Sequence, residues 1–324
     1  MQLICYEQDY LQIMSHEIET AMFVSQPAWH RLGKVLDNPP TTKQAIVEAG
    51  LDWEVHEEPI YQIKNNKPEI IAGYKSLVRN SDRKVLGVVT DYYHPLQNAT
   101  AFAWFDFLLH EGNVTLEAAG SLKGGKRIWI LAKVNNSDAE VQDGDIVNPY
   151  LLLHNSHDGS TAVWIQFTPV RVVCWNTLSW AVRSRYNDLE ASKAIRIRHS
   201  SSLSNQLEIA QTALDFTRQV FSYTVSEYRA MTQKSMTAQL FQQYVSKTFA
   251  TEMPTKIRAW DSIVQNFECG RGNRGESLWD AYNAITEFLD YQRGRSEATR
   301  LESAWFGEGD RLRQKAHESA LSLL

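Results

Sequence analysis

Residues 127–134 read RIWILAKV, a run that is apolar on both faces in its middle, as a strand at the centre of a sheet is. Two more strand-like runs follow, YLLLH at 150–154 and AVWIQFTPVRVVC at 162–174, with Asp158-Gly159 between them. An Asp-Gly pair between two such runs is the strongest short-range signal of a β-hairpin. The stretch therefore predicts three consecutive antiparallel strands.

The sequence around these strands extends the pattern. Pro169 lacks the amide hydrogen that a strand ladder needs, so we expect a bulge or a sheet edge there. A helix-like run at Thr177–Arg185 completes a β-β-β-α unit. Shorter strand-like pieces, rich in β-branched and aromatic residues, precede the unit at Trp53–Ile63, Ile70–Arg79 and Val85–Tyr92.

Helical signals lie on both sides of the strands. Thr41 and Gln44 fit a capping box for a helix over 42–49, and Asn98 can cap a helix that ends before Gly112. After about residue 200, helical periodicity replaces β-branched alternation, and Ser204 can cap a long helix. Further helices are predicted at 237–249, 256–268, 276–292, 296–305 and 309–322.

These elements predict an α+β fold, in which an antiparallel sheet core with a β-β-β-α unit is followed by an all-helical C-terminal region. We expect an N-terminal tail over 1–13, an α+β core domain over 14–200 and a helical region over 201–324. Met14 lies at a second start-like sequence, so either Met1 or Met14 fits as the start.

Composition excludes several classes of protein. The 324 residues include 33 basic and 38 acidic side chains, for a net charge of −5, and 43% are apolar. These values exclude collagen, a disordered acidic tail and a disulfide mini-protein, and they argue against a histone-like, uniformly basic DNA binder. No apolar run approaches the roughly 18 residues that a membrane span needs.

The cysteines and the N-terminus predict a cytoplasmic protein without a membrane partner. Cys5, Cys174 and Cys269 form neither a CxxC pair nor a disulfide framework, so we expect reduced thiols. The first 13 residues carry Glu7 and Asp9 and have no basic n-region, which is unlike a signal peptide.

Basic residues gather near the predicted strands despite the negative total. Residues 171–198 hold six basic and two acidic side chains, a local charge of +4, and tryptophans are interleaved with them. A basic groove with aromatic side chains is what sequence-tolerant single-strand binding requires, although strand tryptophans are more often core and charge groups are usually solvated. The candidate phosphate contacts are Lys123, Lys126, Arg127, Arg171, Arg183, Arg185, Arg196 and Arg198.

The segment GRGNRG at 270–275 matches the letters GxGxxG. Helices, not a βαβ unit, surround it, so the segment does not predict a dinucleotide site, and no cofactor is implied. The loop could still hold an anion through its backbone amides, or simply connect two helices. The residues of this candidate anion-binding loop are Gly270, Arg271, Gly272, Arg274 and Gly275.

A second cluster, His154, His157 and Asp158, offers an alternative metal site. Residues three apart on a strand point to opposite faces, so the two imidazoles converge only if the turn folds His157 back. Cys174 could be a nucleophile at a helix start, but packing is the more common role of such a thiol. Signatures of hydrolases and nucleotide-binding loops are absent from the sequence, so an enzyme is unsupported.

Seven stretches spread over the chain carry a resemblance to a known family. They are MSHEIE (14–19), AWHRLG (28–33), DYYHPLQN (91–98), AGSLKGGKRIWILAKV (119–134), HNSHDGSTAVWIQFTPVRVVCWNTL (154–178), SLWDAYNAITEFLDYQRG (277–294) and WFGEGDRLRQKA (305–316). On these stretches the chain resembles the phage/plasmid-like proteins that share domain of unknown function 932. The resemblance implies carriage by mobile elements and a role in DNA maintenance, recombination or counter-defence.

The order helix, three strands, helix is also similar to the core of phage single-strand annealing proteins, which oligomerise and bind DNA in a basic groove. This likeness is one of topology alone. Together these observations predict a non-enzymatic, homo-oligomeric protein that binds single-stranded DNA. The alternatives are a metal-dependent enzyme acting on nucleic acid or nucleotides, and a counter-defence protein that binds a host component.

Overall fold

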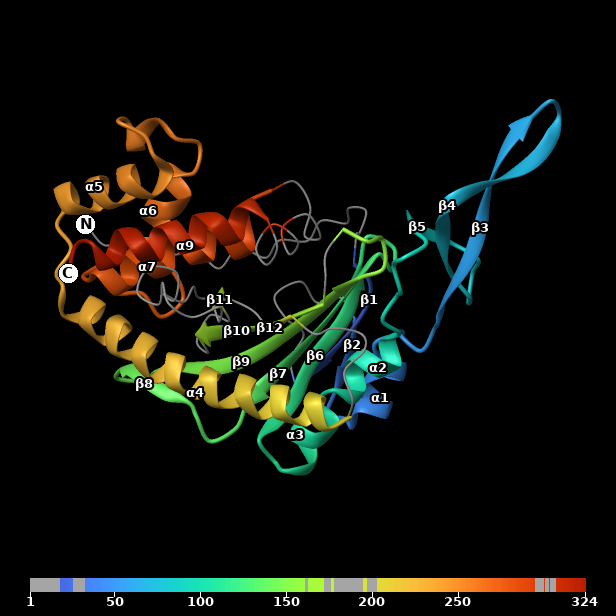
Figure 1. Cartoon of the computed structure of the whole chain (residues 1–324). Helices are drawn as coiled ribbons and strands as arrows, with labels where there is room; N and C mark the ends of the chain where they lie inside the picture. The colour runs from blue at the N-terminus through green and yellow to red at the C-terminus, as the bar shows by residue number, and fades with distance from the viewer. Residues whose placement is uncertain are drawn as a thin grey trace.

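A computed structural model shows a large sheet, an arm that projects from one end of it, and a helical half (Figure 1). The structure describes residues 18–25, 33–160, 163–171, 176–177, 195–196, 203–294, 300, 303 and 307–324. The predicted α+β class is confirmed, because antiparallel strands fill the N-terminal part and helices fill the C-terminal part. No helix among the described residues is long and apolar enough to cross a membrane.

The main sheet has the strand order β11-β10-β9-β7-β6-β1-β2, with β8 paired to β9 and β12 paired to β10. The predicted central strand, RIWILAKV, is β7 and lies between β6 and β9. The strands pair antiparallel, apart from the parallel pair β1–β2. Their bounds are β1 Ile18–Val24, β2 Lys34–Leu36, β6 Val114–Leu122, β7 Arg127–Val134, β8 Ala139–Gln142, β9 Asp145–Ser156, β10 Trp164–Arg171, β11 Asn176–Thr177 and β12 Ile195–Arg196.

Helices cover one face of this sheet. They are α1 (Thr42–Glu48), α2 (Asn98–Ala103), α3 (Asp106–His110) and the first part of α4 (Leu203–Gln233). The capping box of Thr41 and Gln44 is present at α1. The single helix predicted after Asn98 is wrong, because it breaks into α2 and α3 where the adjacent buried rings of Trp104 and Phe105 pack edge to face.

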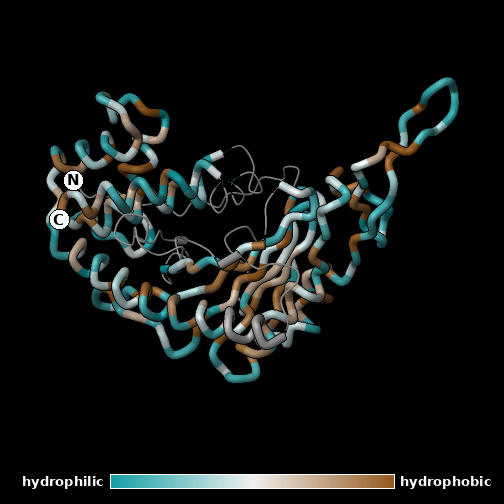
Figure 2. Tube along the Cα trace, in the orientation of Figure 1, coloured by the Kyte–Doolittle hydropathy of each residue, from teal (hydrophilic) through white to brown (hydrophobic). Residues whose placement is uncertain are grey.

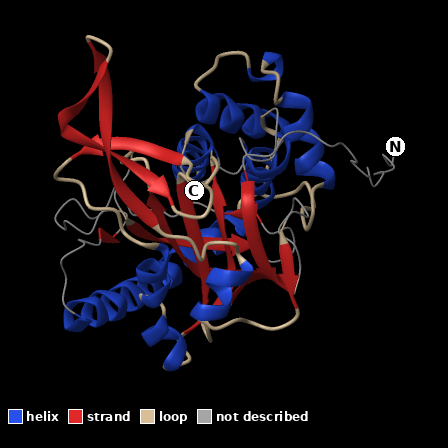
Figure 3. Cartoon of the chain, turned by 90° about the vertical axis from the view of Figure 1, so that its right-hand side faces the viewer, coloured by secondary structure: helices blue, strands red, loops and turns tan. Residues whose placement is uncertain are grey.

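The arm is a separate three-stranded sheet made of β3 (Val55–Lys64), β4 (Lys67–Arg79) and β5 (Val85–Thr90). Asn65 and Asn66 join β3 to β4 with φ of 50° and 61°, the two positive values that a type I′ hairpin turn requires. Because β5 pairs only with the part of β4 that begins at Tyr74, the distal part of the arm is a two-stranded ribbon (Figure 3).

The helical half packs around an aromatic core that also includes Val141, Val147 and Phe167 of β8, β9 and β10. Helix α4 joins the halves, because Ala210, Ala213 and Leu214 contribute to the core under the sheet while Val225 and Tyr228 contribute to the helical core. Hydrophobic residues follow the strands of the main sheet, and the arm tip is hydrophilic (Figure 2). The other helices are α5 Ala238–Phe249, η1 Pro254–Lys256, α6 Trp260–Cys269, α7 Leu278–Glu287, the π-helix η2 Phe288–Gln292 and α9 Glu308–Leu321.

Three expectations change or fall outside the described residues. Asn176 and Thr177 pair with β10 as a short strand where a helix was expected, and residues 178–194 are not described. Most of the helix predicted at 296–305 is also outside the described ranges. Cys269 is disulfide-bonded, which corrects the expectation of three reduced thiols.

Candidate nucleic-acid interface

A row of aromatic residues crosses the sheet on the face opposite the helices. In the strand register Trp129 pairs with His154, His154 pairs with Trp164, and Trp164 pairs with Arg196. Directly opposed residues of neighbouring strands share a face of the sheet. We call the face that bears Trp129, His154 and Trp164 the tryptophan face.

The glycine at position 120 makes room for this row. Gly120 is the β6 partner of Trp129, and a Cβ atom there would lie 3.0 Å from Trp129 Cζ2 and 2.6 Å from the carbonyl oxygen of Thr20. The indole of Trp129 therefore lies over the β6 backbone, and its centroid is 6.2 Å from that of Phe23. Only glycine permits this close approach.

Exposure differs along the row. Trp129 is 1% exposed, whereas His154 and Trp164 are half-buried. Burial, and the positive charge of Arg127, lower the pKa of His154 to about 4. The imidazole is therefore neutral at pH 7, and it places a flat, uncharged ring between the two tryptophans.

Basic residues border one end of the tryptophan face. Arg127 pairs with Ser156 two residues beyond Trp129, and Lys123 and Lys126 lie in the turn between β6 and β7. All three are half-buried, and the charge of Arg127 contributes to lowering the pKa of Asp158. Arg127 also donates a 3.4 Å hydrogen bond to Ser160 Oγ.

Sequence reasoning missed one further lysine at this end. Lys84, at the base of the arm, reaches the turn, because its Nζ occupies the space that a Cβ on Gly124 would need. Nothing in the local sequence signals this contact, which depends on how the arm meets the sheet. Of the other predicted contacts, Arg196 joins the row by register, and Arg183, Arg185 and Arg198 lie outside the described residues.

The structure corrects the assignment of Arg171 as a phosphate contact. Its side chain is fully buried, and it lies at the opposite end of β10 from Trp164, about 23 Å along the strand. The guanidinium donates to Asp145 at 2.6–3.0 Å, to Asn273 Oδ1 at 2.8 Å and to the carbonyl oxygen of Gly272 at 2.8 Å. An arginine committed to these internal acceptors is not available to DNA.

The structure also corrects the candidate anion-binding loop at 270–275. The backbone amides of Arg274, Glu276 and Ser277 donate to the carboxylate of Asp280 at 2.9–3.2 Å. The carbonyl oxygens of Arg271 and Gly272 accept from Arg171. The carboxylate of Asp280 thus occupies the backbone amides that a phosphate would need. The loop is a connector between α6 and α7, bound by Asp280 on one side and by Arg171 on the other. It contains Gly270, Arg271, Gly272, Arg274 and Gly275.

The alternative metal site does not assemble. His157 is fully buried, its Nε2 lies 2.8 Å from Asn98 Oδ1, and its ring meets Trp53 edge to face at 5.2 Å. Asp158 accepts from the amide of Ser160, while His154 belongs to the tryptophan face. Within the described ranges no three His, Cys, Asp or Glu side chains gather as metal ligands would.

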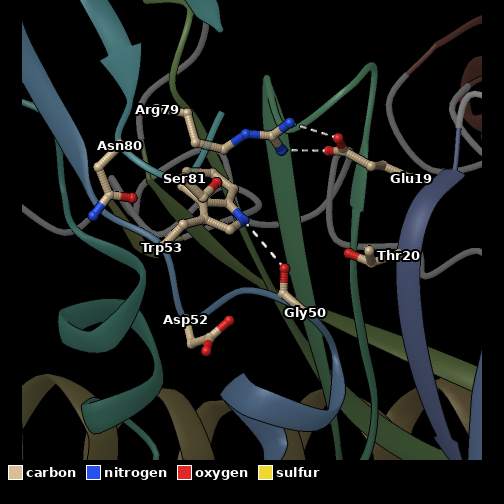
Figure 4. Close-up of a pocket in the computed structure, with 8 residues that line it drawn as sticks. All are labelled: Glu19, Thr20, Gly50, Asp52, Trp53, Arg79, Asn80 and Ser81. Atoms are coloured by element: carbon tan, nitrogen blue, oxygen red, sulfur yellow. Dashed lines mark hydrogen bonds and ion pairs between the residues drawn. The ribbon is translucent and has the colours of Figure 1, made fainter. Parts of the chain in front are cut away.

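An open depression of about 440 Å³ lies where the arm meets the sheet (Figure 4). Arg79 donates to both carboxylate oxygens of Glu19 at 2.6 and 2.7 Å, pairs with Asp82, and lies 5.3 Å from the ring centre of Trp53. Glu19 and Asp82 carry two negative charges against the one positive charge of Arg79. Asp52 adds another negative charge to the lining. The depression therefore suits no phosphate, and its ion pairs anchor the arm.

Comparison with known proteins gives one match. A family model described as "Domain of unknown function (DUF932)" matches residues 85–305, which include β5 through most of the helical half but not β3 and β4. No curated protein and no solved structure matches the chain.

Proposed function

The chain belongs to this family of unknown function, DUF932, and we propose that it is a non-enzymatic protein that binds single-stranded DNA across the tryptophan face. The cross-strand register of Trp129, His154, Trp164 and Arg196 carries the proposal. Trp129 and Trp164 are separated by one strand, so about 10 Å lies between their backbones. A strand of DNA that crosses the sheet along this row meets the rings of His154 and Trp164, whereas Trp129 is buried.

Stacking supplies the sequence-independent part of such binding. Each base stacked on an aromatic side chain contributes about 1–3 kcal/mol, because every base has a π-face. Trp164 and His154 are the half-buried members of the row, so they are the rings that we expect bases to reach. Trp129, beside His154 in register, is buried and packs against Phe23.

The basic border supplies the electrostatic part. Lys123, Lys126 and Arg127, with Lys84, place positive charge at one end of the row, and Arg196 lies beside Trp164 in register. Neutralising phosphates releases counterions, which makes affinity fall as salt rises. The net charge of −5 does not oppose this, because screening in 0.15 M salt limits each charge to about 8 Å.

The test is fluorescence anisotropy of a labelled oligothymidine at low salt, with the wild type and Trp164→Ala. We expect micromolar or tighter binding by the wild type, and a 5- to 150-fold loss for the variant, the equivalent of one stacked base at 1–3 kcal/mol. Tyr92→Ala is the matched control, because Tyr92 is 92% exposed and lies outside the tryptophan face. Equal loss for both variants, or no binding by the folded wild type, contradicts the proposal.

A duplex of the same length tests the stacking step itself. Its bases are paired and stacked on one another, so we expect weaker binding than for the single strand. Equal affinity for both forms would mean that only phosphates are contacted. We further propose that the protein is homo-oligomeric, acts in the cytoplasm for a phage or plasmid, and anneals complementary strands during recombination, which a two-oligonucleotide energy-transfer assay measures directly.

A further inference from the structure

The turn between β6 and β7 has an unusual backbone. Leu122 and Arg127 pair across the two strands and enclose residues 123–126. Lys123, Gly124 and Gly125 have φ of 55°, 65° and 85°, and a positive φ is uncommon for a lysine. Successive amides in turns of this kind form concavities that bind anions, as glycine-rich phosphate loops do. The β6–β7 turn therefore has the backbone conformation of an anion site.

The amides of this turn have no acceptor inside the protein. Among the residues that the structure describes, none accepts a hydrogen bond from the backbone amides of Gly124, Gly125 or Lys126. Only the carbonyl oxygen of Lys126 is engaged, because it accepts from the amide of His157 at 2.7 Å. Backbone amides are strong donors that folded proteins rarely leave unpaired. The turn thus offers consecutive donors to water or to a bound anion.

A lysine from the arm lies against this turn. Lys84 is exposed, and its Nζ occupies the space that a Cβ on Gly124 would need. Hydrogen bonds from Arg79 and from the backbone of Lys84 lower the pKa of Asp82, and the carboxylate of Asp82 pairs with Arg79 at 2.5 Å. In the part of the chain that the structure describes, no carboxylate forms an ion pair with Lys84 Nζ. The ammonium and the amides therefore lie together without an internal anion between them.

The two glycines of the turn have different surroundings. A Cβ atom on Gly125 would lie 2.8 Å from Arg79 Nη1 and 3.3 Å from Glu19 Oε2, the ion pair that lines the acidic depression (Figure 4). Gly125 is buried there, whereas Gly124 is half-buried and faces Lys84. Glu19 is neutralised by Arg79, so the uncompensated charge at the turn is the positive charge of Lys84. An anion is therefore favoured on the Gly124 side of the turn and not in the depression.

The donors at the turn suit a phosphate at the end of a chain better than one within it. A phosphodiester of the DNA backbone has two free oxygens and a single negative charge. A phosphomonoester has three free oxygens and a charge of about −1.5 to −2 at pH 7. The amides of Gly124, Gly125 and Lys126 match three oxygens, and Lys84 balances part of the higher charge. The composition of the site therefore favours the monoester.

We propose that the β6–β7 turn and Lys84 bind a phosphomonoester, either at the end of a DNA strand or in a free nucleotide. The strand-end form rests on the proposed function, because the tryptophan face then holds the adjoining base. Ser156, the partner of Arg127 at the end of the turn, lies two residues, about 7 Å, along β9 from His154. A nucleotide spans this distance from its base to its phosphate, so a terminal base on His154 places its phosphate at the turn.

The test is calorimetric titration of the full chain with short oligothymidines that carry a 5′-phosphate, a 3′-phosphate or neither. Thymidine monophosphate and thymidine are titrated in the same way. We expect a terminal phosphate to tighten binding about tenfold, which one hydrogen bond to a charged group supplies. The two phosphorylated strands show which end is bound. Binding of thymidine monophosphate without a preference among the strands would identify the free nucleotide as the ligand.

Two variants and a control locate the effect at the turn. Lys84→Met removes the ammonium at an exposed position, so we expect unchanged thermal unfolding. Gly124→Ala keeps every charge, but its methyl group takes the space of Lys84 Nζ and disfavours the positive φ. Each variant should reduce the tenfold preference for the phosphomonoester to about twofold or less. Lys67→Met, at an exposed lysine on the tip of the same arm, should keep the preference.

Failure of this site and failure of the proposed function give different results. Equal binding of strands with and without a terminal phosphate, and no binding of thymidine monophosphate, overturns the phosphomonoester site and leaves single-strand binding intact. Binding of thymidine monophosphate that Lys84→Met abolishes, without binding of any strand, supports the site and contradicts the proposed function. A preference that both turn variants retain overturns the assignment to the β6–β7 turn.

Discussion

Arg171 at the end of β10 and Arg127 at the start of β7 belong to one sheet and to similar stretches of sequence, yet they differ in their surroundings. Arg171 is fully buried and donates to an internal carboxylate and three further internal oxygens. Arg127 remains half-buried beside the tryptophan face. A basic residue has a structural role where the fold buries it beside an acceptor, as it does Arg171 beside Asp145. A basic residue that stays partly exposed, as Arg127 does, is a candidate ligand contact.

The largest expected effect comes from removing the buried ion pair of Arg171 with Asp145. Arg171→Met leaves the carboxylate of Asp145 buried without its cation, with the neutral donors Trp279 Nε1 and Gln142 Nε2 at 2.8 and 3.4 Å, so we expect a loss of about 3–5 kcal/mol in the free energy of unfolding. Urea denaturation measures it. Adding Asp145→Asn should restore part of the lost free energy of unfolding, because burial of a neutral amide is less unfavourable than burial of an unpaired charge. Arg127→Ala is the control, with a change within about 0.5 kcal/mol.

An intermediate effect concerns the buried imidazole of His157. Burial lowers its pKa to about 4, below the ordinary value of about 6.5, so the unfolded chain takes up a proton that the folded chain refuses. Stability therefore falls as pH drops through 6.5 and continues to fall until pH 4. Between pH 7 and pH 5 this one group costs about 2 kcal/mol at 1.36 kcal/mol per unit of pKa difference.

The variant His157→Gln isolates that contribution. We expect its free energy of unfolding to decline less between pH 7 and pH 5, by the same 2 kcal/mol, whatever its stability at pH 7. His154 and His317, whose pKa values burial lowers to about 4 and about 3, keep the rest of the decline in place. A variant with an undiminished decline would mean that His157 is protonated as readily in the folded chain as in the unfolded one.

The smallest effect compares two arginines in DNA binding. Arg127→Ala should weaken oligonucleotide binding severalfold and reduce the slope of log affinity against log salt by about 0.7, the value for one phosphate contact on a single strand. Arg274→Ala is the matched variant, because Arg274 is exposed but lies in the loop held by Asp280. It should leave the slope unchanged. If Arg274 lowers the slope and Arg127 does not, the interface lies on the helical half.

Local patterns predicted most of the strands and several helices. The Asp-Gly turn between β9 and β10, the capping box at Thr41 and the long helix after Ser204 each depend on neighbours in the chain, so one sequence suffices to place them. The break between α2 and α3 was missed, because helical spacing alone does not show that two adjacent bulky rings must both enter the core.

The site was less predictable, because its contacts are distant in the chain. Arg171 and the 270–275 loop were separate anion-binding candidates, and their contact spans about 100 residues. The tryptophans of β7 and β10 were visible in the sequence, but which residues oppose one another depends on strand register. Period-two alternation gives the face of each residue and not its partner across the sheet.

Helix α4 has a consequence for cooperativity. It is 31 residues long, about 46 Å, and one continuous hydrogen-bonded rod is shared by two cores that otherwise have different members. Unfolding of the helical half would remove Ala210 and Leu214 of α4 from the core under the sheet. Unfolding of the sheet would remove the packing that holds the N-terminal part of α4, whose C-terminal part contributes Val225 and Tyr228 to the helical core. Because α4 contributes side chains to both cores, opening of either core is coupled to the other.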